Sequence, residues 1–247
     1  DLPPTPLMQQ EQNPATAENL AALRQTVSGS EQGLPHHSDE SLARFLWAKK
    51  TVDRAAVLVK SYDAFVAKHN IQNLTFAEVE DVFNLELYIC HPEMRANNGE
   101  VILWARPRNL LRSLPAEKVQ MFMFFMLNTV TLRVPACKEK GIALIIDWRG
   151  AGLKNINLGV PPLVLKMVQE CLPARMKLIM HIEQPIFFSV IWTIIYPLLS
   201  SKLRSRVRLL GPVAKLTEFV PLDRLPVELG GPLNVSLDDT RRLLLGA

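Results

Sequence analysis

The sequence has few cysteines, no membrane-spanning apolar run and little excess charge. Its three cysteines, Cys90, Cys137 and Cys171, lie far apart and form no Cys-x-x-Cys pair, which excludes a disulfide framework and favours a reducing compartment. A formal net charge of +4 over 247 residues is too small to indicate nucleic-acid binding. No run approaches the roughly 20 apolar residues that cross a bilayer, and the N-terminus does not resemble a secretory signal. We therefore expect a cytoplasmic protein.

The motifs of the common catalytic mechanisms are also missing. There is no Gly-x-Ser-x-Gly, His-Glu-x-x-His, P-loop or Cys-x5-Arg pattern. His36 and His37 are adjacent but lie in a Pro/Gly/Ser connector, and His181 fits a buried core imidazole better than a catalytic base. Asp147 ends an apolar strand as a single carboxylate, which favours a structural role. We expect binding rather than catalysis, with no metal and no cofactor.

What the sequence does have is an apolar segment, residues 186–199, that runs directly into a basic cluster. Nearly every residue of this segment is apolar, so it has no polar face to present to water. At about 14 residues it is too short to span a bilayer. Four cations follow within residues 202–208, with no carboxylate among them. An apolar element beside clustered cations is typical of a protein that contacts membranes at the surface.

The pattern of the chain changes twice. Residues 1–16 are predicted to form a flexible arm, and residues 17–70 a small helical subdomain with apolar residues at helical spacing. The remainder, residues 71–247, alternates apolar strands with helices, which predicts an α/β fold with a mostly parallel sheet. The expected strands are 101–104, 141–148, 176–182 and 206–210, and the expected helices are 115–134, 161–171 and 186–199.

Five segments, taken in order, resemble the CRAL-TRIO lipid-binding domain family. They are FLWAKKTVDRAA (45–56), GIALIIDWRG (141–150), CLPARMKLIMHIEQP (171–185), PLLSSKLRSRVRLLG (197–211) and LPVELGG (225–231). The resemblance implies a helical subdomain followed by a lipid cage, whose floor is the sheet and whose mobile gate helix matches residues 186–199. It also implies a monomer that encloses one hydrophobic ligand and transfers or presents it between membranes. The ligand classes are phospholipid, tocopherol, retinoid, carotenoid, sterol and squalene.

The resemblance further implies two sets of site residues. Positions that contact anionic headgroups in the family are basic here, and the expected headgroup residues are Lys49, Lys50, Arg175, Lys202, Arg204 and Arg206. The family's phosphatidylinositol site also has a Glu and a Thr where this sequence has Ala174 and Leu203, which argues against phosphatidylinositol as the enclosed ligand. The expected cavity residues are Phe122, Phe125, Met126, Ile145, Met167, Ile179, Phe187, Val190, Ile191, Ile194 and Leu198.

Other interpretations of these residues stay open at this point. The basic cluster could be an ordinary solvated helix face, and the apolar positions could be ordinary core. The family also occurs fused to a protein tyrosine phosphatase and to exchange factors, and PARMKLIM with the later PIFF resembles the phosphatase-linked version. The chain could therefore be a targeting module of a larger signalling protein that binds phosphoinositide or phosphatidylserine. Sequence continuing well beyond Ala247 would favour that alternative.

Overall fold

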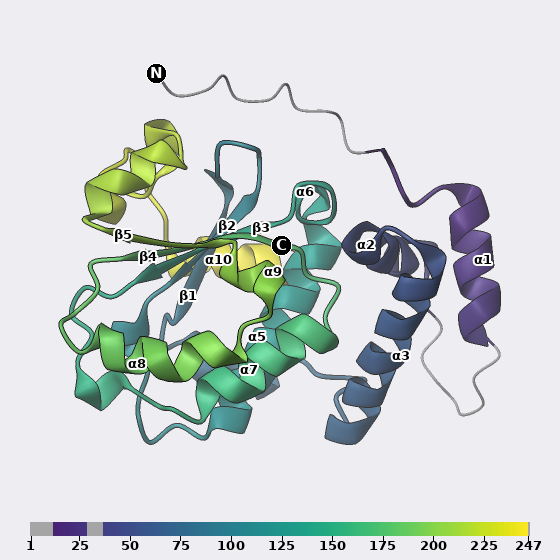
Figure 1. Cartoon of the computed structure of the whole chain (residues 1–247), viewed down its shortest axis with the longest axis horizontal. Coiled ribbons are helices and arrows are strands. Elements are labelled where there is room, and N and C mark those ends of the chain that lie inside the picture. The colour runs from purple at the N-terminus through teal and green to yellow at the C-terminus, as the bar shows by residue number, and fades with distance from the viewer. Residues whose placement is uncertain (1–11, 29–36, 247) are drawn as a thin grey trace.

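The structure is a computed structural model that describes residues 12–28 and 37–246. Most of the expected N-terminal arm, including residues 1–11, lies outside the described residues. A group of three helices lies at one end of the molecule, and an α/β part makes up the rest (Figure 1). The two share one continuous apolar core, so the division near residue 70 stays a prediction.

The helical group consists of α1 (Ala17–Ser28), α2 (Asp39–Lys49) and α3 (Val52–His69), which pack against one another. The Ser38 side chain accepts a hydrogen bond from the Ser41 amide at the start of α2, as a helix N-cap requires. Lys50, with φ of 72°, ends α2 in the left-handed conformation, and α3 begins two residues later. This tight junction holds the two lysines at the end of α2 against the α/β part.

The sheet has five strands, and their order in space equals their order in the chain. They are β1 (Tyr88–Arg95), β2 (Val101–Ala105), β3 (Ile142–Asp147), β4 (Met176–Ile182) and β5 (Val207–Gly211). β1 pairs with β2 in antiparallel orientation, and every later pair is parallel. β2 is buried along its whole length, as a strand covered on both faces must be. The predicted mostly parallel α/β fold is confirmed.

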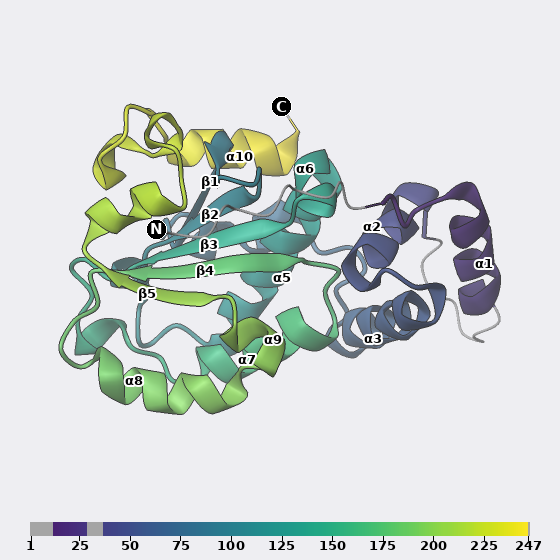
Figure 2. The ribbon, with the colours of Figure 1, turned by 45° about the horizontal axis from the view of Figure 1, so that its top comes forward.

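Different elements cover the two faces of the sheet (Figure 2). One face lies against α5 (Ala116–Arg133), α7 (Val160–Glu170) and α8 (Phe188–Ile195), with α9 (Ser201–Arg204) at the β5 side. The other face is covered by the turns of residues 212–235. α10 (Leu237–Leu245) lies along the outer edge of β1, where the Thr240 hydroxyl accepts from the Cys90 amide and donates to the Cys90 carbonyl oxygen, and it also packs against α5. Short helices α4 (Glu80–Phe83) and α6 (Pro135–Glu139) complete the fold.

The sequence did not indicate β1, α10 or the short helices α4, α6 and α9, and one expected helix is shorter than predicted. β1 contains Pro92, which breaks the strand pattern, and its pairing with β2 is irregular beyond Cys90. The start of α10 is marked by a capping box in which Ser236 and Asp239 exchange hydrogen bonds. The expected helix over 186–199 is α8 followed by one tighter turn, Tyr196–Leu198, because Pro197 has no amide hydrogen to continue the α-helical pattern.

Candidate ligand cavity and basic pocket

An apolar cavity of about 240 Å³ lies between the sheet and helices α5, α7 and α8. Leu144 and Ile146 lie on the central strand but are only half-buried, because their side chains face this cavity instead of packed atoms. Among the lining residues are Tyr88, Leu103, Ala105, Val119, Met123, Leu127, Trp148, Val164, Val168, Met176, Ile179, His181, Ile191, Trp192, Ile195, Leu199, Leu203 and Val207. Nearly all of these side chains are apolar, so the cavity suits a hydrophobic ligand.

The alternation of the strands decides which side chains reach the cavity. On β3, Leu144 and Ile146 line it, whereas Ala143 and Ile145 are fully buried in the core on the other face of the sheet. On α5, the lining residues Val119, Met123 and Leu127 recur every four positions, which is the spacing of one helix face. On these two elements, the side chains that line the cavity therefore come from one face of β3 and one face of α5.

Helix α8 lines the cavity with apolar side chains, and its solvent side exposes apolar side chains beside Ser189 and Thr193. Ile191, Trp192 and Ile195 line the cavity, and Ile191 is only 6% exposed. On the opposite side, Ile186, Val190 and Ile194 form an outward stripe, with Val190 64% exposed. Residues 186–199 are therefore not wholly buried in this conformation. An exposed apolar stripe of this kind marks an interaction surface.

Only Ile179 and Ile191 of the eleven expected cavity residues line the cavity. Ile145 lies on the other face of the sheet, since neighbouring residues of a strand point in opposite directions. Val190, Ile194 and Leu198 point outward from the gate segment and are exposed.

The remaining expected cavity residues lie in packed core. Phe122, Met126 and Met167 are almost fully buried in the main core beside the cavity. Phe125 packs with the ring of Phe76, and Phe187 packs against the small cluster around Trp148. The physical reason is the phase of each helix. A shift of one position turns a side chain by about 100°, and the largely apolar composition of α5 gives no clear polar face from which to set that phase.

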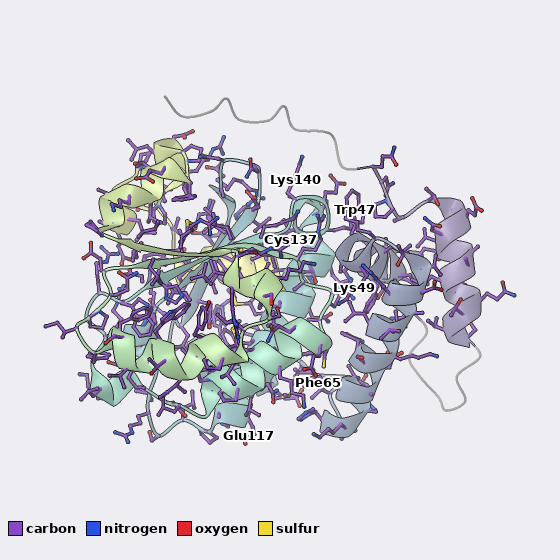
Figure 3. The ribbon with its side chains drawn as sticks, in the orientation of Figure 1. Trp47, Lys49, Phe65, Glu117, Cys137 and Lys140 are labelled. Carbon is purple, nitrogen blue, oxygen red and sulfur yellow. The ribbon has the colours of Figure 1, made fainter. Side chains whose placement is uncertain are left out.

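A basic pocket of about 500 Å³ lies where the helical group meets the α/β part. Its cations come from four separate stretches of chain, and no carboxylate is among its lining residues. Lys49 lies at the end of α2 that faces the α/β part (Figure 3). The cations are Lys49, Lys50, Arg54, Arg175, Lys177, Lys202 and Arg206.

The cations of the basic pocket repel one another. Burial lowers the pKa of Lys202, and the charges of Arg206, Lys49, Lys177 and Arg175 lower it further. Burial and the charge of Arg175 likewise lower the pKa of Arg206. A bound anion would relieve this repulsion, so the pocket is electrostatically suited to a phosphate or another compact anionic group.

Two of these cations are fixed by neighbouring groups. The Arg175 guanidinium donates to the Lys138 and Glu139 carbonyl oxygens and lies 5.6 Å from the Trp47 ring. The Arg206 guanidinium donates to the Met176 carbonyl oxygen. Both side chains therefore hold their positions without an anion present, and the pocket is pre-formed.

Five of the six expected headgroup residues line this pocket. Arg204 does not line it. Its guanidinium donates to the Tyr196 and Pro197 carbonyl oxygens, 3.2 Å and 3.3 Å away, and lies over the Tyr196 ring. Arg204 thus hydrogen-bonds to the C-terminal end of residues 186–199. Arg54 and Lys177 were missed, although Lys177 follows Arg175 by two positions along the chain and could have been inferred from strand alternation.

The basic pocket and the apolar cavity share a wall. Val168, Met176 and Leu203 line both. Leu203 lies on α9 between the residues of the gate segment and the cations of the basic pocket. A lipid with its tail in the cavity and an anionic group in the basic pocket would therefore contact the two sides of the same three side chains.

The other polar groups singled out in the sequence have structural partners. The Asp147 carboxylate is fully buried and accepts hydrogen bonds from Arg149, Arg108 and the Trp104 indole. Burial alone would raise its pKa, but the hydrogen bonds and charge of Arg149 and the charge of Arg108 hold that pKa below its usual value. The His37 Nε2 lies 2.9 Å from Asp63 Oδ1, while His36 is outside the described residues. Within 12–28 and 37–246, no three potential metal-ligating side chains cluster.

Comparison with known proteins gives the family. The model of the CRAL/TRIO domain matches residues 85–231, more than half of the chain. The chain belongs to the CRAL/TRIO domain family. This is a lipid-binding and lipid-transfer family, and the resemblance drawn from the five sequence segments is confirmed.

Individual relatives match a shorter stretch. Tyrosine-protein phosphatase non-receptor type 9 of Homo sapiens is 32% identical over 100 residues, which is 40% of this chain and 17% of the phosphatase. Clavesin-1 of Rattus norvegicus is 31% identical over 109 residues, 42% of this chain and 30% of clavesin-1. The matched region thus spans less than a third of either relative.

A solved structure shares the fold. The crystal structure of Sfh5 aligns with a TM-score of 0.59 over 97% of this chain and 98% of that chain, at 9% sequence identity. At that identity the likeness is one of fold. In the described part of this CRAL/TRIO chain, we find no helix of sufficient length and apolar character to span a bilayer.

Proposed function

We propose that this protein encloses one hydrophobic ligand in the apolar cavity and transfers or presents it at membranes, with α8 as the gate. The observation that carries the proposal is the two-sided character of α8, which lines the cavity with Ile191 and Ile195 and exposes Val190 and Ile194 to solvent. A helix of a soluble protein normally keeps a polar outer face. An apolar outer face is explained if α8 inserts into the headgroup region of a membrane when the gate opens.

The basic pocket supports membrane docking from a second direction. Seven cations and no carboxylate are among its lining residues, and each Lys or Arg close to an anionic surface contributes about 1 kcal/mol to binding. Transfer of an exposed apolar side chain into hydrocarbon contributes at most about 1.5–3 kcal/mol. The outward stripe and the basic pocket together give reversible, peripheral binding.

Two neighbouring residues of α8 test the two roles of the gate separately. Val190→Asp places a charge on the outward stripe and is expected to abolish flotation with anionic vesicles while the purified protein keeps its lipid. Ile191→Asp places the charge in the cavity wall and is expected to remove the bound lipid. Val227→Asp, at a residue that is 60% exposed on the opposite face of the sheet, is the matched control. Equal lipid content and equal flotation in all three variants would contradict the gate assignment.

The second candidate function is a targeting module within a larger signalling protein. The similarity to a tyrosine-protein phosphatase favours it, because that match covers only 17% of the phosphatase. In that case the basic pocket would bind membrane phosphoinositide or phosphatidylserine and position a catalytic partner. A protein that is purified without lipid but still binds anionic vesicles would support this candidate over the carrier.

A further inference from the structure

The polar side chain of His181 lines the apolar cavity next to α8. The strand register places Tyr88, Ala105, Ile146 and His181 in one row across the sheet, and all four line the cavity. His181 is only 4% exposed. Ala105 and Ile146 separate His181 from Tyr88 by three strand spacings, about 14 Å between Cα atoms. Within this row the imidazole is therefore separated from the Tyr88 hydroxyl by two apolar side chains, and the other polar lining residues, Arg106, Asn155 and Asn157, lie outside the row.

The contact with Trp148 determines which imidazole nitrogen carries the proton. The indole Nε1 of Trp148 lies 3.1 Å from His181 Nδ1. An indole N–H can only donate, so Nδ1 must accept, and a neutral ring then carries its proton on Nε2. Burial lowers the pKa of His181 to about 3, so the ring is neutral at physiological pH.

The Nε2–H group has no hydrogen-bond acceptor in the part of the chain that the structure describes. Its surroundings are aromatic. The Phe188 ring lies 5.3 Å and the Trp192 ring 5.6 Å from the imidazole, between centroids, and the Trp148 ring stacks on it at 6.2 Å. Phe188 and Trp192 belong to α8, so the gate covers this donor when closed. Because His181 lines the cavity, a ligand there can supply the acceptor for this donor.

We propose that the ligand of this cavity carries a neutral acceptor oxygen, a hydroxyl or carbonyl, which accepts a hydrogen bond from His181 Nε2–H beneath α8. This inference rests on the proposed function and narrows the class of ligand that the function allows. A neutral imidazole offers no charge to balance a carboxylate or phosphate, and the Arg106 guanidinium, which also lines the cavity, is already paired with Glu86 and Glu228. An oxygenated, otherwise apolar molecule satisfies the site, whereas a pure hydrocarbon leaves Nε2–H unpaired.

The test is a double-mutant cycle in which one change removes the His181 imidazole and the other removes the oxygen of the ligand. N-phenyl-1-naphthylamine serves as the fluorescent reporter of the cavity, and 1-dodecanol and dodecane compete for it. The two competitors differ by a single oxygen, so the ratio of their dissociation constants cancels most of the chain contribution. We expect this ratio to shift about tenfold against the alcohol in His181→Phe. His181→Gln, which restores an amide N–H, should recover part of the wild-type ratio.

Tyr88→Phe is the matched control because it removes the other polar group of the same row. It should leave the ratio within twofold of wild type. A ratio unchanged in His181→Phe, or one that moves in Tyr88→Phe instead, overturns the inference. Should the wild type bind neither reporter nor competitors, the proposed function itself fails, and the inference with it.

A measurement on the wild type removes the dependence on variants that might not fold. With 15N-labelled histidine, the His181 Nε2 resonance should shift on saturation with 1-dodecanol and stay in place with dodecane. The same shift with both competitors, or with neither, would show that no hydrogen bond forms and would overturn the inference.

Discussion

Replacement of two lysines of the basic pocket should strengthen the fold and weaken membrane binding. Lys49 and Lys202 belong to a cluster of like charges in which burial and the neighbouring cations lower the pKa of Lys202. Methionine keeps most of the length of lysine and removes its charge. The double variant Lys49→Met, Lys202→Met should therefore relieve repulsion and unfold at a higher temperature than wild type in low salt.

Membrane affinity should change in the opposite direction. With about 1 kcal/mol per cation at an anionic surface, the loss of two charges weakens binding by about 2 kcal/mol, or about 30-fold. The assay is flotation with phosphatidylcholine vesicles that contain phosphatidylserine or a phosphoinositide, and the difference should shrink in high salt. A control variant, Lys60→Met with Lys215→Met, removes the same charge from exposed positions outside the basic pocket.

Two results would refute this reasoning. If the control pair weakened flotation as much as the pocket pair, net charge rather than the basic pocket would explain binding. If the pocket pair lowered the unfolding temperature, the cations would be stabilised by partners and not in mutual repulsion. The lowered pKa of Lys202 also gives a sign for pH. Above its folded pKa the repulsion disappears, so wild-type stability should rise with pH up to the unfolded pKa of about 10.4, and the variant should lack this rise.

Three further predictions concern the buried polar groups and thiols. Asp147→Asn should reduce the free energy of unfolding by about 3 kcal/mol at pH 7 because it leaves buried arginine charge unpaired. Since the folded pKa of Asp147 is lowered, the difference in free energy of unfolding between the variant and wild type should fade as pH falls below about 4. A difference that stayed constant in urea melts from pH 7 to pH 3 would contradict the ion pair. Asn128→Leu should cost about 3 kcal/mol, since it removes the side-chain oxygen that lies 2.9 Å from the buried Arg44 guanidinium, and unchanged denaturation midpoints would show that Arg44 is satisfied by its other partners. Cys171, which is half-buried, should react with a maleimide in the native protein before the two fully buried thiols, whose pKa values burial raises; mass spectrometry showing equal labelling of all three would contradict this burial.

The fold was predictable where the sequence has short, continuous apolar runs. Val101–Ala105 is apolar along its length, and Ile142–Asp147 is apolar up to its last residue, which marks strands buried on both faces. β1 was hidden by Pro92 and by polar residues at its outer end. α10 was missed, although Ser236 and Asp239 carry a capping signal.

The site was predictable in its chemistry but not in its residues. The basic pocket was largely anticipated because cations on a polar background are distinctive, and the fold had only to bring Lys49, Arg175 and Lys202 together. The cavity residues were mostly wrong because α5 is apolar on nearly all sides. Nothing in such a sequence tells whether Phe122 or Met123 points inward. Only the packing of α5 in the folded protein decides which of its faces points into the cavity.

Native mass spectrometry of the purified protein, followed by organic extraction of whatever dissociates, tests the central claim most directly. The account predicts one hydrophobic molecule per chain, and the His181 inference predicts that this molecule carries a neutral oxygen. A protein that is consistently empty and whose mass is unchanged after incubation with lipid vesicles would contradict the carrier function.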